Sequence, residues 1–168
     1  MSSRGEIILV HELALEEIVC LPNSLSDISV EHPFKDETLK WTWTSSKISD
    51  QFLLEFWSRD YNWFIQNAWS NADLLEISGP DTIELFLPHR YIIVVTCGYS
   101  WTVIKENSQL QSYLEKVAKW IGDKVGVEQL LFTREENLYS LEEYQSHTLK
   151  EVIDKFKKCK VEFQVWTV

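Results

Sequence analysis

The cysteine at position 97 is the residue whose type and setting come closest to chemistry. Cys97 follows a run of apolar and β-branched residues, 91–96, and precedes Gly98. Such a run is typical of a strand buried on both faces, so we expect the thiol where the strand gives way to a loop. A thiol there can act as a proton donor or nucleophile if its pKa is tuned; the plain alternative is a small buried side chain beside a turn glycine. The residues alone leave both interpretations open.

Histidines and the remaining cysteines add little chemistry by their spacing. The histidines are scattered, so we expect each to be a surface residue: His11, His32, His89 and His147. The cysteines are odd in number and show no C-x-x-C spacing, which predicts reduced thiols and no metal site: Cys20, Cys97 and Cys159. The motifs of phosphate-binding loops, dinucleotide-binding folds, zinc proteases and serine hydrolases are also missing from the sequence.

The hydrophobic pattern predicts the elements that would position Cys97. We expect strands over 38–44, 73–78, 82–87, 91–96, 127–133 and 161–168, with a hairpin turn at 79–81. Helical spacing predicts two short helices within 49–71, a helix from 107 to 122 or 126, and another over 141–158. The prediction is an α+β domain over 31–168, a largely antiparallel sheet with helices on one face, on which residues 1–30 pack as an N-terminal arm.

Composition limits the classes of function. At 168 residues and 45% hydrophobic, the chain is long enough for one core. The net charge of −10 argues against a nucleic-acid partner, because such proteins carry basic patches. No apolar run is long enough to cross a membrane, and we expect a cytoplasmic protein. The eight tryptophans are predicted to be mostly core or interface anchors.

Several segments together resemble a known family. Residues 96–100, with Phe86 eleven positions before Cys97, are similar to a segment of the eukaryotic-type S-adenosylmethionine decarboxylases. Residues 32–37, 63–65, 131–134 and 145–147 resemble further segments of that family in the same order. The similarity covers about residues 7–168 but only the first half of the family's chain. It implies one layer of an αββα sandwich, in which two sheets pack face to face with their helices outside.

The resemblance also implies roles for individual residues. Cys97 stands at the family's proton-donor position, and Phe34 matches the aromatic residue that stacks on the substrate's adenine. The glutamate that follows this aromatic residue in the family is replaced by Lys35, and Asp36 or Glu37 could compensate. We therefore expect Phe34 and Glu37 to bind a ligand.

The chain departs from the family at the position that makes its members active. They cleave themselves before a serine, which becomes a pyruvoyl group, and Ile83 occupies this position here. Ile83 cannot form that group, so we expect no pyruvoyl cofactor and no decarboxylase activity. The expected function is that of a non-catalytic or regulatory homologue linked to polyamine or S-adenosylmethionine metabolism, which forms a homodimer or pairs with a related chain.

Two alternatives remain open on the sequence. The chain could be a repurposed module that binds S-adenosylmethionine or a polyamine, which an acidic surface would suit. It could instead be an acidic binding or inhibitor protein, like an immunity protein, that blocks a basic partner.

Overall fold

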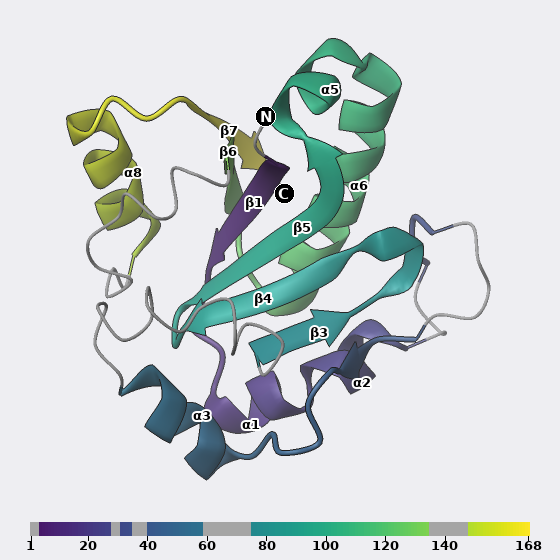
Figure 1. Ribbon diagram of the computed structural model, residues 1–168, viewed down its shortest axis with the longest axis vertical. Helices are drawn as coiled ribbons and strands as arrows, with labels where there is room; N and C mark the ends of the chain where they lie inside the picture. The colour runs from purple at the N-terminus through teal and green to yellow at the C-terminus, as the bar shows by residue number, and fades with distance from the viewer. Residues whose placement is uncertain (1–3, 28–30, 35–39, 59–74, 135–147) are drawn as a thin grey trace.

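The strands form one antiparallel sheet. The computed structural model describes residues 4–27, 31–34, 40–58, 75–134 and 148–168. Within them the sheet has seven strands in the order β2-β3-β4-β5-β1-β6-β7, and every neighbouring pair is antiparallel (Figure 1). The strands are β1 (Arg4–Val10), β2 (Thr42–Trp43), β3 (Glu76–Ser78), β4 (Glu84–His89), β5 (Ile92–Ser100), β6 (Gln129–Arg134) and β7 (Phe163–Thr167). The predicted α+β class and antiparallel sheet are confirmed.

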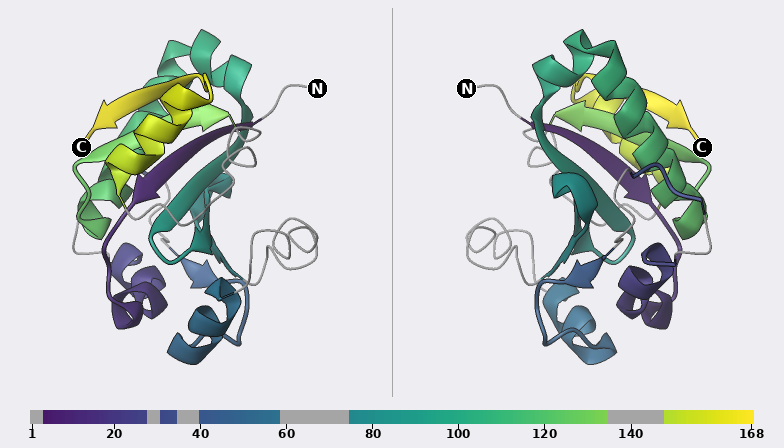
Figure 2. Two further views of the ribbon diagram at one scale, coloured as in Figure 1. Left: turned by 90° about the vertical axis from the view of Figure 1, so that its left-hand side faces the viewer. Right: turned by 90° about the vertical axis from the view of Figure 1, so that its right-hand side faces the viewer.

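Helices cover both faces of this sheet, which corrects the expectation of helices on one face. The larger core lies on one face beneath α1 (Leu15–Val19), α2 (Leu21–Leu25), α3 (Asp50–Trp57), α5 (Trp101–Glu106) and α6 (Ser108–Val125). On the other face, α8 (Leu149–Lys158) packs through Val152 and Phe156 on the central strands (Figure 2). Because β1, β5 and β6 are apolar on both faces, each face requires a cover. None of the described helices is long and apolar enough to cross a membrane.

The strand β1 lies at the centre of the sheet. It pairs with β5 on one side and β6 on the other, and Ile7, Ile8 and Leu9 are all buried. Ile7 and Leu9 belong to the larger core, whereas Ile8 faces α8. The sequence suggested an arm packed on the domain over 1–30; over Arg4–Val10 the chain is instead a central strand, which explains why its segment Ile7–Val10 has no polar face.

Capping residues set the bounds of the helices beside the sheet. The Asn107 side chain accepts a hydrogen bond from the backbone N–H of Leu110 at 3.0 Å, which starts α6. The helix ends at Gly126, whose φ of 84° is left-handed; this is the second of the two ends, 122 and 126, that the sequence leaves open. The short helix α5 was not expected; its N-cap is Ser100, whose hydroxyl accepts from Val103 N at 3.2 Å.

The predicted hairpin joins β3 to β4 through a strained turn. Gly79 lies directly under the ring of Trp41, and a Cβ at this position would collide with the indole. Gly79 does not have a left-handed backbone conformation. Asp81 and Thr82 do, with φ of 53° and 64°. The Asp81 carboxylate accepts a hydrogen bond of 2.6 Å from the Tyr113 hydroxyl of α6, which ties the turn to the helix.

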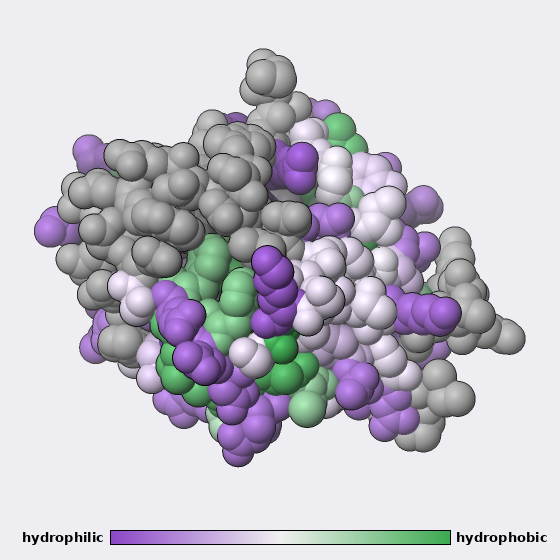
Figure 3. All heavy atoms as spheres, turned by 60° about the horizontal axis from the view of Figure 1, so that its bottom comes forward, coloured by the Kyte–Doolittle hydropathy of each residue, from purple (hydrophilic) through white to green (hydrophobic). Residues whose placement is uncertain are grey.

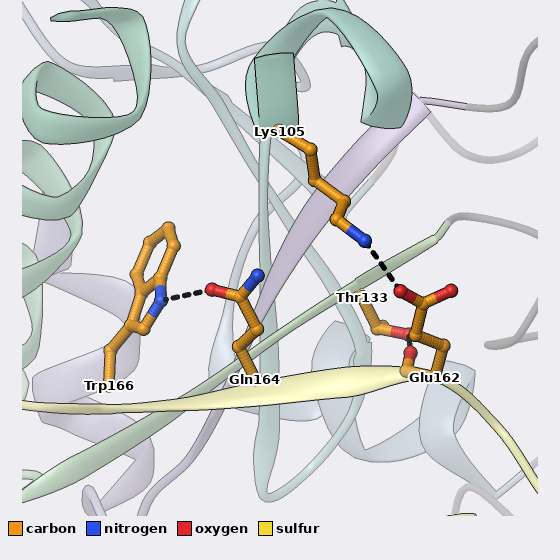
Figure 4. A network of polar contacts seen from close by, with 5 residues as sticks. All are labelled: Lys105, Thr133, Glu162, Gln164 and Trp166. Atoms are coloured by element: carbon orange, nitrogen blue, oxygen red, sulfur yellow. Dashed lines mark hydrogen bonds and ion pairs between the residues drawn. The ribbon is translucent and has the colours of Figure 1, made fainter. Parts of the chain in front are cut away.

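Polar contacts surround β7 at one edge of the sheet, and one of them links this edge to a helix (Figure 4). Lys105 of α5 forms an ion pair of 2.6 Å with Glu162, just before β7, and lowers the pKa of this carboxyl group. The Thr133 hydroxyl donates to the Glu162 carbonyl at 2.8 Å. The indole N–H of Trp166 donates to the Gln164 side chain at 3.2 Å, so Trp166 is buried with its polar atom satisfied.

The described tryptophans pack in or against the core, as predicted. Trp41, Trp101 and Trp166 are buried, and Trp43, Trp57 and Trp120 pack against the larger core. Trp63 and Trp69 lie outside the described residues.

Candidate functional site

Cys97 lies inside a strand rather than at its end. β5 continues to Ser100, and the left-handed Gly98, with φ 78°, lies where the register between β5 and β1 shifts. The Cys97 side chain is only 4% exposed and belongs to the larger core. Burial raises the pKa of the thiol, so it stays protonated at neutral pH and is a poor nucleophile. The expectation of a thiol at a strand end is therefore corrected.

This burial gives a direct prediction for thiol reactivity. Cys20 and Cys159 are exposed, so both should react with Ellman's reagent in the native protein at neutral pH. Cys97 should react only after denaturation, because the reagent needs an accessible thiolate. Intact-mass measurement should thus show two labels on the folded protein and three in guanidinium. Rapid native labelling of Cys97, located by peptide mapping, would contradict its placement in the core.

The predicted ligand residues lie in different surroundings. Phe34 is 6% exposed and packs edge-on against Trp41 and Trp120, with ring centroids 5.9 and 5.8 Å away. The ring centroid of His32 also lies 6.0 Å away, so the Phe34 ring is enclosed by three aromatic side chains and little of it is exposed to an adenine. Glu37 lies outside the described residues.

Phe34 and Cys97 both belong to the larger core, but Phe34 contacts Trp41 and Trp120, whereas the Cys97 carbonyl accepts a hydrogen bond from Thr82. The described contacts therefore do not join the two residues into one site.

A pocket of about 470 Å3 lies where β1 and β6 separate. Their ladder ends at the pair Ile8–Leu131, although β1 continues to Val10 and β6 begins at Gln129. We call this space the His11 pocket. It is lined by residues 10–13, by Glu17 of α1, by residues 125–129 between α6 and β6, and by Thr148 and Leu149 at the start of α8. Its size falls within the usual range for small-molecule sites.

Its lining combines carboxylates with apolar side chains. Glu12, Glu17 and Glu128 are exposed acidic residues of the lining, and the described lining includes no lysine or arginine. Apolar walls come from five other lining residues: Val10, Leu13, Val125, Val127 and Leu149. Seen from the end of the molecule with α1 and α3, the surface likewise shows apolar patches beside hydrophilic side chains (Figure 3). The described part of the chain holds no group of acidic, histidine or cysteine side chains arranged to bind a metal ion.

His11 is the buried polar residue of the pocket. Only 1% of it is exposed, and its backbone N–H donates to the Tyr91 carbonyl at 2.9 Å, which fixes it beside the β4–β5 hairpin. Its Nδ1 accepts a hydrogen bond of 3.1 Å from the backbone N–H of Leu13. Burial lowers the pKa of the imidazole to about 4, with further lowering by the charges of Arg90 and His89. His11 is therefore neutral at physiological pH.

Sequence reasoning missed this site. His11 was expected at the surface, like the other histidines, and the pocket is assembled from three segments that are distant along the chain: 10–17, 125–129 and 148–149. One signal was available: His11 directly follows the apolar run 7–10, so it occupies the next position of a strand that proved to be central.

Comparisons with known proteins do not identify the chain. The resemblance to S-adenosylmethionine decarboxylases remains a prediction from the sequence, because no protein family, curated protein or solved structure matches this chain.

Proposed function

We propose that this protein is a non-catalytic binding protein for small aliphatic amines, which it holds in the His11 pocket. The observation that carries the proposal is the lining of this pocket, in which Glu12, Glu17 and Glu128 adjoin apolar walls. An alkylammonium ion has the matching chemistry, a cationic head for carboxylates and a methylene chain for apolar side chains. Each methylene group removed from water contributes about 0.8 kcal/mol.

The proposal is consistent with what the sequence resemblance implies. Polyamines and S-adenosylmethionine, the ligands expected from that resemblance, both carry ammonium groups. Ile83, at the position of the family's cleavage serine, is buried and cannot supply a pyruvoyl group. A role linked to polyamine metabolism therefore requires binding and not decarboxylation.

The location of α8 makes ligand binding a better supported proposal than pairing with a related chain. Pairing of two such layers would place a second sheet on the face opposite α6. On that face, α8 packs over Ile8, Val94 and Leu131. A partner sheet would have to displace α8 or be confined to the rest of the face.

Amine binding is tested by calorimetry and by NMR titration of the ¹⁵N-labelled protein. Putrescine, spermidine and S-adenosylmethionine are the first probes. We expect putrescine or spermidine to bind, with shifts centred on residues 10–13 and 125–129, and to bind more weakly as salt is added. Replacing both Glu12 and Glu128 by glutamine should lower the affinity on the order of tenfold, since each exposed carboxylate contributes up to about 1 kcal/mol.

A matched charge change elsewhere provides the control. Glu55 and Glu106 are exposed and do not line the pocket, so the double change to glutamine removes the same charge and should leave the affinity nearly unchanged. Equal losses in both double variants would show a general charge effect. Absence of any shift in the pocket with all three probes would refute the proposed function.

A further inference from the structure

The hydrogen bonding of His11 fixes which ring nitrogen carries the proton. Because the Leu13 N–H donates to Nδ1, this nitrogen acts as the acceptor. The proton of the neutral ring is therefore on Nε2. His11 lines the pocket, and its Nε2 is buried with no hydrogen-bond partner among the residues that the structure describes. A buried N–H without an acceptor is unfavourable, so a group that brings an acceptor to it gains binding energy.

The start of α8 provides a second donor region on the same pocket. Thr148, the N-cap, and Leu149, the first helical residue, both line the pocket. The Thr148 hydroxyl accepts from Glu151 N at 3.2 Å, and the first N–H groups of a helix have no partner within it. Together with the helix dipole, this end of the ten-residue helix favours an acceptor or a negative charge.

The pocket thus offers two kinds of recognition. Glu12, Glu17 and Glu128 attract a cation, whereas the His11 Nε2–H and the start of α8 require an acceptor. We infer that the ligand is an aliphatic amine whose other end carries a hydrogen-bond-accepting oxygen, and that His11 donates to this oxygen. The inference rests on the proposed function and narrows its ligand class: a protonated diamine such as putrescine can bind the carboxylates but has no acceptor for His11, so it should bind more weakly than an amine that carries one.

Three probes of equal chain length separate the two requirements. n-Pentylamine has only the ammonium group, 5-aminopentan-1-ol adds a neutral oxygen acceptor, and 5-aminopentanoate adds an anionic one. We expect one of the two oxygen-bearing amines to bind on the order of tenfold more tightly than n-pentylamine. The one that binds better shows whether the acceptor is a hydroxyl or a carboxylate.

Two substitutions of His11 test whether the preference for an oxygen-bearing amine depends on the Nε2–H donor. In His11→Asn the side-chain oxygen replaces Nδ1 as acceptor for Leu13 N–H, but the Nε2 donor is lost. In His11→Gln the amide nitrogen lies near the place of Nε2 and retains a donor. The preference for the oxygen-bearing probe should fall to about onefold in His11→Asn and survive in part in His11→Gln. In the wild type, NMR should show the His11 Nε2 proton moving downfield with that probe only.

The outcomes distinguish the two proposals. If n-pentylamine binds as tightly as both oxygen-bearing probes, or if His11→Asn keeps the preference, the inference is overturned while amine binding stands. If none of the amines binds, both proposals fail.

Discussion

Replacing Phe132 by alanine is expected to lower the free energy of unfolding by about 3–5 kcal/mol. Phe132 is fully buried on β6 and lies between two indoles, with ring centroids 4.5 Å from Trp101 and 4.8 Å from Trp166. It also packs over Gly5 of β1. Truncation would open a cavity between the two indoles and beneath Gly5, which cannot collapse without moving the backbone. Urea unfolding followed by circular dichroism measures the loss.

A substitution on the neighbouring strand is the control for Phe132. Val165 of β7 is 43% exposed and pairs with Leu131. Val165→Ala should cost less than about 1 kcal/mol, because little buried area is lost. Phe132→Leu should fall between the two. Similar losses for Phe132→Ala and Val165→Ala would mean that Phe132 is not packed as the structure shows.

Acidification is expected to destabilise the protein through His11. In the unfolded chain the imidazole takes up a proton below about pH 6.5, whereas in the folded protein it does so only near pH 4. Between these values the unfolded state binds more protons, so stability falls as the pH falls. The slope approaches about 1.4 kcal/mol per pH unit, and the whole window amounts to about 3 kcal/mol.

The substitution His11→Asn isolates this effect from that of the carboxyl groups. Asparagine can still accept from Leu13 N–H but does not titrate. The difference in stability between wild type and variant should therefore change between pH 6.5 and 4, with the wild type losing more. The neighbouring charged and titratable groups, Arg90 and His89, are present in both proteins. Parallel stability curves, or an NMR titration of His11 near its ordinary pKa, would contradict the burial of its ring.

Local patterns predicted the parts of this fold that local interactions decide. The helix α6 has a capping side chain at Asn107, which the sequence predicts, and a left-handed glycine at Gly126, which is one of the two ends that the sequence leaves open. The hairpin at 79–81 is another example, although the strain falls on Asp81 and Thr82 because Gly79 is needed under Trp41.

Features that depend on distant segments could not be predicted in this way. The apolar run at Ile7–Val10 was interpreted as part of an N-terminal arm, because nothing local to it shows that β5 and β6 flank it. The face that α8 covers is decided by the alternation of β1, β5 and β6 together. The His11 pocket depends on where the β1–β6 ladder ends, which is a property of the register. The sequence therefore pointed to Cys97 and Phe34, whose burial is clear only when the core is assembled.

The central position of β1 has a consequence for synthesis on the ribosome. It pairs with β5 (residues 92–100) and β6 (residues 129–134), which are synthesised later. At about 5–20 residues per second, roughly 6–25 s pass between the synthesis of β1 and that of β6. During that time the uncharged segment Ile7–Val10 has unpaired edges and can associate with other nascent chains. The strand β1 is thus expected to need protection from such association until translation has passed β6.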